Sequence, residues 1–146
     1  MKNLFPILFV LLCANAATAQ DLHSIVPKTP DARLLQVYDA DYLQRLETLQ
    51  PDFLQRLNYY LDNSYMIVPQ PEGKTVENYT TVAMPANRAD FNIFKMEREQ
   101  KVGRLKSSPL YFHIANSTDL LILLSEDEFV KKFNAATGRV YAPRVR

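Results

Sequence analysis

The sequence predicts an α+β fold, with N-terminal helices, a small, mainly antiparallel sheet of three to four strands, and a C-terminal helix. Two observations indicate this order. Apolar residues recur at helical spacing up to residue 63, and short β-rich segments separated by polar turns follow as far as residue 124. With 47% hydrophobic and 23% charged residues, the chain has the composition of a globular domain and not of a disordered polyelectrolyte.

Three short helices are predicted before residue 64. The first begins at Thr29-Pro30-Asp31, which offers a capping hydroxyl, a proline at the first helical position and an acid near the positive end of the helix dipole. Asp39 caps the second helix, and Pro51-Asp52 opens the third. The apolar stripes of the three helices are, in order, Leu34, Leu35 and Tyr38; Leu43 and Leu46; and Phe53, Leu54, Leu57, Tyr60 and Leu61.

The strands are predicted from composition and from the residues that break them. Residues 65–68 are β-rich and end at a proline, residues 80–82 form a brief edge strand, and residues 110–115 and 119–124 form a hairpin across a polar turn. Because Leu120–Leu124 is apolar at every position, we expect a central strand that is buried on both faces.

Residues 91–102 allow two interpretations. Phe91–Met96 alternates as a strand covered on both faces does, whereas residues 97–101 are good helix formers and Gly103 is a candidate helix stop. We predict a strand, because the strands that follow need partners.

The last helix has the clearest boundary. Ser125 and Glu128 have the S-x-x-E form of a capping box, and the helix that follows directs Phe129, Val130 and Phe133 inward and ends near residue 138. The predicted organisation is a single domain over residues 31–138, preceded by an N-terminal arm (residues 20–30) and followed by a basic C-terminal tail (residues 139–146).

The first 19 residues are predicted to be a signal peptide. Lys2 is followed by an apolar run over residues 4–13 and then by the small-x-small cleavage pattern Ala17-Thr18-Ala19. A membrane span needs roughly 20 apolar residues, so we expect cleavage near Ala19 and no transmembrane segment afterwards. We therefore expect a periplasmic or secreted chain without cysteine, because Cys13 is the only one and the two leucines before it do not fit a lipidation site.

The sequence carries no recognisable catalytic motif. Its three glycines are too scattered for a phosphate-cradling loop, and His23 and His113 do not have the spacing of a zinc hydrolase. We expect His113 to be a structural residue on a strand, and the carboxylate pairs Asp39/Asp41 and Glu97/Glu99 to be solvated. The sequence predicts no catalytic residue, no cofactor and no metal.

Charge is unevenly distributed along the expected mature chain. Residues 20–87 contain 5 basic and 9 acidic side chains, and residues 88–146 contain 11 and 7. Such halves attract each other within one fold, or they present a dipolar surface to a partner, and we expect the first. The net charge of 0 after cleavage gives no drive toward nucleic acid, so no nucleic-acid partner is predicted.

A tyrosine cluster at a helix-to-strand junction is one candidate for partner binding. It contains Tyr59, Tyr60, Asn63 and Tyr65, and tyrosine is favoured at contact surfaces. In the alternative interpretation, Tyr60 belongs to the core and Asn63 ends the helix.

A basic segment is the other candidate. Lys101, Arg104 and Lys106 would form an exposed tip between two strands and meet an acidic protein surface. No aromatic residue is interleaved for base stacking, and the alternative is an ordinary solvated loop.

As a whole, the sequence resembles small exported proteins of unassigned function from bacteria of the Bacteroidota type. The features that resemble them are the signal end Ala19-Gln20, the stretch Leu57–Tyr65 and the later Phe91-Asn92-Ile93. The resemblance implies an envelope or secreted location and no active site. We expect a non-enzymatic interaction or envelope accessory protein, whose partner is another envelope or secreted protein. The alternative is a small hydrolase whose carboxylate- or Ser/His-based site is visible only in three dimensions. A third possibility is a lipid or small-ligand carrier, which would need an enclosed apolar cavity.

The export prediction is directly testable. We expect the native protein to begin at Gln20, because cleavage follows Ala19. N-terminal sequencing of the protein recovered from its host checks this, and retention of Met1 or recovery from the cytoplasm would contradict it.

Overall fold

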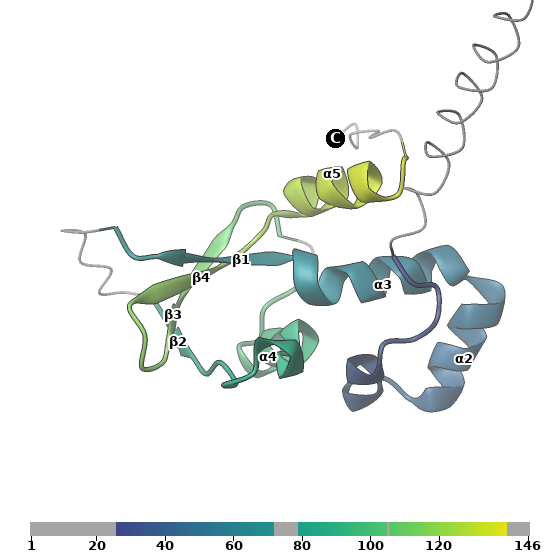
Figure 1. The fold of residues 1–146 in the computed structure, drawn as a ribbon, viewed down its shortest axis with the longest axis horizontal. Coiled ribbons are helices and arrows are strands. Elements are labelled where there is room, and N and C mark those ends of the chain that lie inside the picture. The colour runs from purple at the N-terminus through teal and green to yellow at the C-terminus, as the bar shows by residue number, and fades with distance from the viewer. Residues whose placement is uncertain (1–25, 72–78, 105, 140–146) are drawn as a thin grey trace, which may run out of the picture.

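The computed structural model describes residues 26–71, 79–104 and 106–139. The predicted signal peptide, the start of the N-terminal arm and most of the basic tail lie outside these residues. Within them the fold is α+β, as predicted: helices first, then a four-stranded sheet, and a final helix (Figure 1). No helix of this part of the chain is long and apolar enough to span a membrane.

The N-terminal helices begin where the sequence predicts, except that the first starts two residues later, with Asp31 and not Thr29 as its N-cap, and that Asp39 at the second makes no side-chain capping hydrogen bond. They are the 3₁₀ helix η1 (Ala32–Gln36) and the α-helices α2 (Ala40–Leu49) and α3 (Pro51–Asn63). Asp31 caps η1, because its side chain accepts a hydrogen bond of 2.8 Å from the Arg33 amide. Pro51 occupies the first turn of α3, which separates it from α2.

Two polar side chains of α3 hold the described end of the N-terminal arm. The Asn58 amide nitrogen donates to the carbonyls of Pro27 (2.8 Å) and Thr29 (2.6 Å), and its oxygen accepts from the Asp31 amide (3.0 Å). The Gln55 amide donates to the carbonyl of Val26 at 2.9 Å. Residues 26–31 are therefore bound along α3 by side chains that satisfy their backbone groups.

An arginine joins η1 to the end of α3. The Arg33 guanidinium donates to both carboxylate oxygens of Asp62 (2.7 and 2.8 Å) and also contacts the Asp31 carboxylate at 3.0 Å. The hydrogen bonds from Arg33 lower the pKa of Asp31. Such forked contacts fix orientation as well as charge, so they hold the two helices in one arrangement.

The sheet has the strand order β1-β4-β3-β2, formed by β1 (Tyr65–Pro69), β2 (Thr81–Val82), β3 (Leu110–Ile114) and β4 (Asp119–Leu123). Only the β2–β3 pair is parallel, so the mainly antiparallel sheet and the hairpin are confirmed. The core face of β4 carries Leu121 and Leu123, both fully buried.

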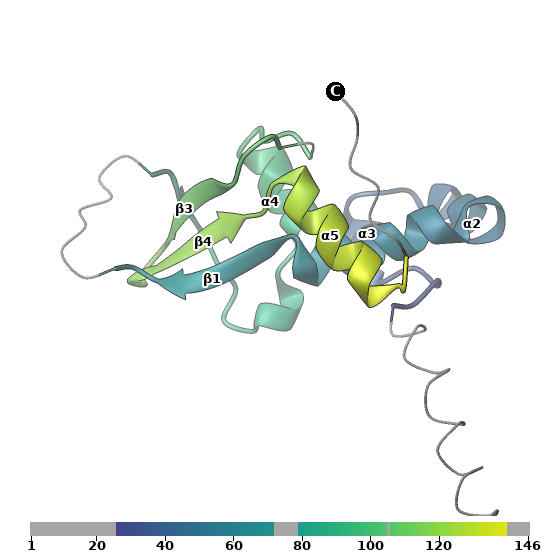
Figure 2. The same cartoon turned by 90° about the horizontal axis from the view of Figure 1, so that it is seen from above.

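The opposite face of the sheet is more open than expected. Ile122 lies between Met66 on β1 and Tyr111 on β3, which are 39% and 42% exposed. No described helix lies over this face (Figure 2). The prediction that β4 is buried on both faces is therefore wrong at Ile122, although its central position is confirmed.

The strand predicted over Phe91–Met96 is wrong. After the short 3₁₀ helix η2 (Arg88–Asp90), residues Ile93–Glu99 form the α-helix α4. The Asn92 side chain caps it by accepting hydrogen bonds from the Phe94 (3.1 Å) and Lys95 (3.3 Å) amides. Four of its residues are buried on one broad face at the helical spacing i, i+1, i+3 and i+4, namely Ile93, Phe94, Met96 and Glu97.

The last helix, α5 (Glu126–Ala136), begins with the predicted capping box. The Ser125 hydroxyl accepts from the Glu128 amide (3.3 Å) and donates to its carboxylate (2.8 Å), and this hydrogen bond lowers the pKa of Glu128. Beyond α5, Arg139 forms an ion pair of 3.1 Å with Asp52, which joins the basic C-terminal half to the acidic N-terminal half. This contact fits the expected attraction between the two halves.

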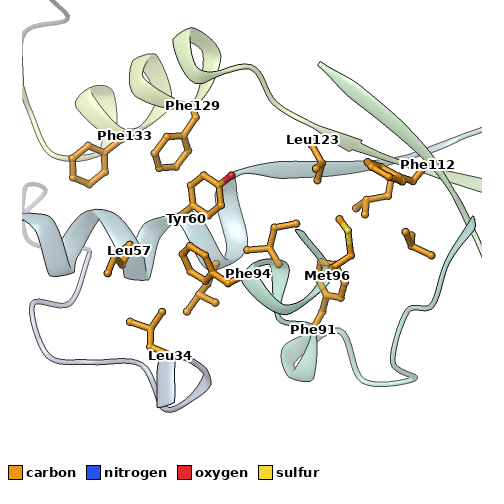
Figure 3. Close-up of a cluster of buried hydrophobic side chains, with 14 of the residues drawn as sticks. Leu34, Leu57, Tyr60, Phe91, Phe94, Met96, Phe112, Leu123, Phe129 and Phe133 are labelled. Atoms are coloured by element: carbon orange, nitrogen blue, oxygen red, sulfur yellow. The ribbon is translucent and has the colours of Figure 1, made fainter. Parts of the chain in front are cut away.

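The core joins the helices to one face of the sheet. Figure 3 shows Phe129 and Phe133 from α5, Tyr60 from α3 and Phe94 from α4 at one end, and Phe112 and Leu123 of the sheet at the other. Helix α3 packs against α2, α4 and α5, so it is the central element of the helical part.

Burial in the core predicts different costs for two truncations in the sheet. Leu121→Ala should lower the free energy of unfolding by about 2–5 kcal/mol, because it removes a fully buried side chain and leaves a cavity. Met66→Ala, on the open face, should lower it by about 1 kcal/mol or less. Urea denaturation measures both, and equal losses would contradict the assignment of the core face.

Candidate functional site

A hydrogen-bonded set of three polar side chains lies inside the protein where α3, α4 and the segment before β3 meet. The Tyr60 hydroxyl donates to a carboxylate oxygen of Glu97 at 2.6 Å, and the Lys106 ammonium donates to the Tyr60 hydroxyl at 2.8 Å and to the same Glu97 oxygen. The Lys106 and Glu97 side chains are each only 4% exposed. We call Tyr60, Glu97 and Lys106 the buried triad.

Burial determines the protonation of the tyrosine. It raises the pKa of the Tyr60 hydroxyl far above its ordinary value, and the nearby Glu97 carboxylate raises it further. The hydroxyl, which is protonated at neutral pH even at its ordinary pKa, is thus held more firmly in the protonated, hydrogen-bond-donating form. The second Glu97 oxygen has no hydrogen-bond donor among the described residues, so the carboxylate depends on Tyr60 and Lys106 for its stabilisation.

A pocket of about 250 Å³ adjoins the buried triad and shares Tyr60 with it. Helix α3 contributes one stripe of side chains, α4 contributes Phe94, and the start of α5 contributes a second wall. The exposed side chains of Phe53 and Arg104 lie at its mouth. The pocket-lining residues are Phe53, Arg56, Leu57, Tyr60, Phe94, Arg104, Leu124, Ser125, Glu126 and Phe129.

The aromatic walls of the pocket are ordered by ring contacts. The Tyr60 ring stacks on Phe94 with 5.1 Å between centroids and meets Phe129 edge to face at 4.9 Å. Figure 3 shows the three rings one above another, from α5, α3 and α4. Because the buried triad fixes the Tyr60 hydroxyl, it also fixes the ring from which the wall is built.

Two arginines lie over these walls. The Arg56 guanidinium carbon is 5.6 Å from the centroid of Phe129, and that of Arg104 is 5.4 Å from Phe94 and 5.6 Å from Tyr38. Across the described part of the chain, neither arginine has a carboxylate within ion-pair distance. A guanidinium over a ring keeps its in-plane N–H donors for a carboxylate or phosphate, so the pocket is suited to an anion with an apolar body.

The structure separates the residues of the predicted basic segment. Lys106 is 7% exposed, so the prediction that it belongs to an exposed tip is wrong: its ammonium is needed to neutralise Glu97. The expectation that Glu97 is solvated is wrong for the same reason. Arg104 is exposed and reaches the pocket, whereas Lys101 is exposed at the end of α4 and lies outside it.

The predicted tyrosine cluster is likewise divided. Tyr60 is in the core, as in the alternative interpretation, and Tyr59 packs on Phe133 of α5 with 5.5 Å between ring centroids. The Asn63 amide donates to the carbonyl of Tyr59 at 3.0 Å within the last turn of α3, and the Tyr65 ring packs on Phe91. Of the seven predicted site residues, the structure brings together Tyr60, Arg104 and Lys106.

Sequence reasoning missed Arg56 and Glu97. Arg56 lies on the same α3 stripe as Phe53, Leu57 and Tyr60, so its position was readable from helical spacing. Glu97 is an inward residue because residues 93–99 are helical, whereas the predicted strand places it in a solvated segment.

The described residues hold no group of three or more His, Cys, Asp and Glu side chains that would bind a metal ion. Comparisons with protein-family models, curated proteins and solved structures give no significant match.

The buried ion pair predicts strong coupling between its two members. Lys106→Met should cost about 3–5 kcal/mol of unfolding free energy, because it leaves a buried carboxylate uncompensated. The double variant Lys106→Met, Glu97→Leu should cost clearly less than the sum of the single changes. Urea denaturation of the four proteins measures the coupling, with the exposed Lys101→Met as the matched control. Additive costs, or a Lys106→Met loss as small as that of the control, would contradict the buried pair.

Proposed function

We propose that this protein is an exported, non-enzymatic binding protein that takes the anionic group of its ligand or partner in the pocket between α3, α4 and α5. The observation that supports the proposal is the pair of arginines held over the aromatic walls of the pocket. Both guanidiniums reach one small concave site, although Arg56 and Arg104 come from segments far apart in the sequence. Export is supported by the signal-peptide pattern that ends at Ala19.

The geometry favours binding over the hydrolase alternative. A nucleophile or general base must reach a bound substrate, but Glu97 and Lys106 are almost entirely enclosed by protein. Burial raises the pKa of Tyr60 above its ordinary value, so its phenolate form is even less accessible than that of a solvated tyrosine. These three groups therefore serve to hold the pocket wall in place, and the groups that face the pocket mouth are recognition groups.

An aromatic sulfonate tests the binding site. We expect anilinonaphthalene sulfonate to bind the purified protein, and the double variant Arg56→Gln, Arg104→Gln to weaken binding by about tenfold or more through lost charge-assisted hydrogen bonds. Binding should also weaken with added salt, because one guanidinium lies at the exposed mouth. Fluorescence titration measures both effects.

The matched control is Lys101→Gln, Lys132→Gln, which removes the same charge at two exposed positions outside the pocket. This variant should bind the probe as the unmodified protein does. If circular dichroism shows that both variants are folded and they bind the probe with equal affinity, the proposed site is wrong.

A further inference from the structure

We propose that the ligand of this pocket is a small monocarboxylate with an apolar body of about ten non-hydrogen atoms, such as a medium-chain alkanoate. This inference rests on the proposed function and narrows it to one chemical class. Three features of the pocket support it: its charge, its volume and the chemistry of its walls.

The charge of the lining favours a monoanion. Its ionisable groups at neutral pH are the guanidiniums of Arg56 and Arg104 and the carboxylate of Glu126, which leave a balance of one positive charge. Next to Glu126, the first turn of α5 also carries Asp127 and Glu128. These acids already offset the positive end of the helix dipole, and a doubly charged phosphate in the pocket would also meet the Glu126 carboxylate of the lining. A singly charged carboxylate meets less of this repulsion and still fits the guanidinium donors.

The volume limits the size of the apolar body. A protein cavity of about 150 Å³ accommodates benzene, so the observed volume of about 250 Å³ corresponds to roughly ten non-hydrogen atoms. Octanoate has this size. A longer chain would have to extend past Phe53 at the mouth, where burial is incomplete.

The walls match an acyl or arylalkyl chain. Four of the lining residues, Leu57, Leu124, Phe94 and Phe129, are buried apolar side chains. Burial of each methylene against such walls strengthens binding by about fourfold. The buried triad holds the Tyr60 ring in place before the ligand enters. Binding therefore does not have to order this side chain, which favours a higher affinity.

Calorimetry with matched ligands tests the class. We expect octanoate to bind the purified protein about tenfold more tightly than 1-octanol, and octyl phosphate at pH 8 to bind more weakly than octanoate. Affinity should rise by about fourfold per methylene from hexanoate to octanoate and then level off. Because Arg104 is exposed, we expect the Arg104→Gln variant to fold. It should bind octanoate about tenfold more weakly and bind octanol with unchanged affinity.

Several outcomes would overturn the inference. If 1-octanol binds with the same affinity as octanoate, the pocket is an apolar site without anion recognition. If octyl phosphate binds more tightly than octanoate, the pocket prefers a dianion. An acetylated peptide ending in phenylalanine that binds more tightly than octanoate would assign the pocket to a protein C-terminus. If none of these carboxylates binds while the aromatic sulfonate still binds in an arginine-dependent way, the monocarboxylate class is wrong and the proposed function stands. If the sulfonate binding does not depend on the arginines, the proposed function itself fails.

Discussion

The ion pair between Lys106 and Glu97, closed on the Tyr60 hydroxyl, is the interaction on which the helical part of the molecule depends. It joins α3, α4 and the segment that leads into β3. Removing two charges from water costs several kcal/mol per ion, and only close mutual contact offsets this cost. An apolar set of similar volume would fill the same space, but it would not fix the rotation of the Tyr60 ring. The ion pair therefore stabilises one arrangement of the aromatic walls over others of similar compactness.

Helix α3 carries this arrangement because three of its faces are used at once. Gln55 and Asn58, three residues apart, bind the N-terminal arm, while Leu54 and Leu61 are fully buried in the core. The pocket stripe, from Phe53 through Arg56 to Tyr60, lies on the remaining face. Helical spacing alone puts these sets on different sides. A change on one face that rotated α3 would thus disturb the arm, the core and the pocket together.

The sequence predicts those parts of the fold that local signals specify. Pro51 at a helix start, the capping box at Ser125 and the polar turn of the β3–β4 hairpin each act within a few residues, and each was confirmed. The prediction is wrong at helix α4 because a short apolar run such as residues 91–96 fits both a strand and a buried helix, and only the Asn92 cap distinguishes the two locally. If residues 93–99 are not helical, Glu97 does not point inward. Lys106 then has no buried partner, and the sequence predicts it to be exposed to solvent. The pocket could not be predicted, because its walls come from segments whose packing no local pattern encodes.

The same aromatic packing that stabilises the helices also leaves room for a ligand. Strand β4 is central in the sheet, and α5 follows it at once and packs on α3 instead of covering the open sheet face (Figures 1 and 2). The start of α5 therefore lies beside the C-terminal end of α3, where the Leu124 amide donates to the Ser64 carbonyl at 2.8 Å, and the Tyr60 ring contacts both Phe94 and Phe129. Arg56 and Arg104 cover the flanking rings from outside. Because guanidiniums are weakly hydrated and already rest on apolar faces, little hydration has to be removed when an anion binds to them. This makes the pocket mouth better prepared for a carboxylate than a pair of solvated lysines would be.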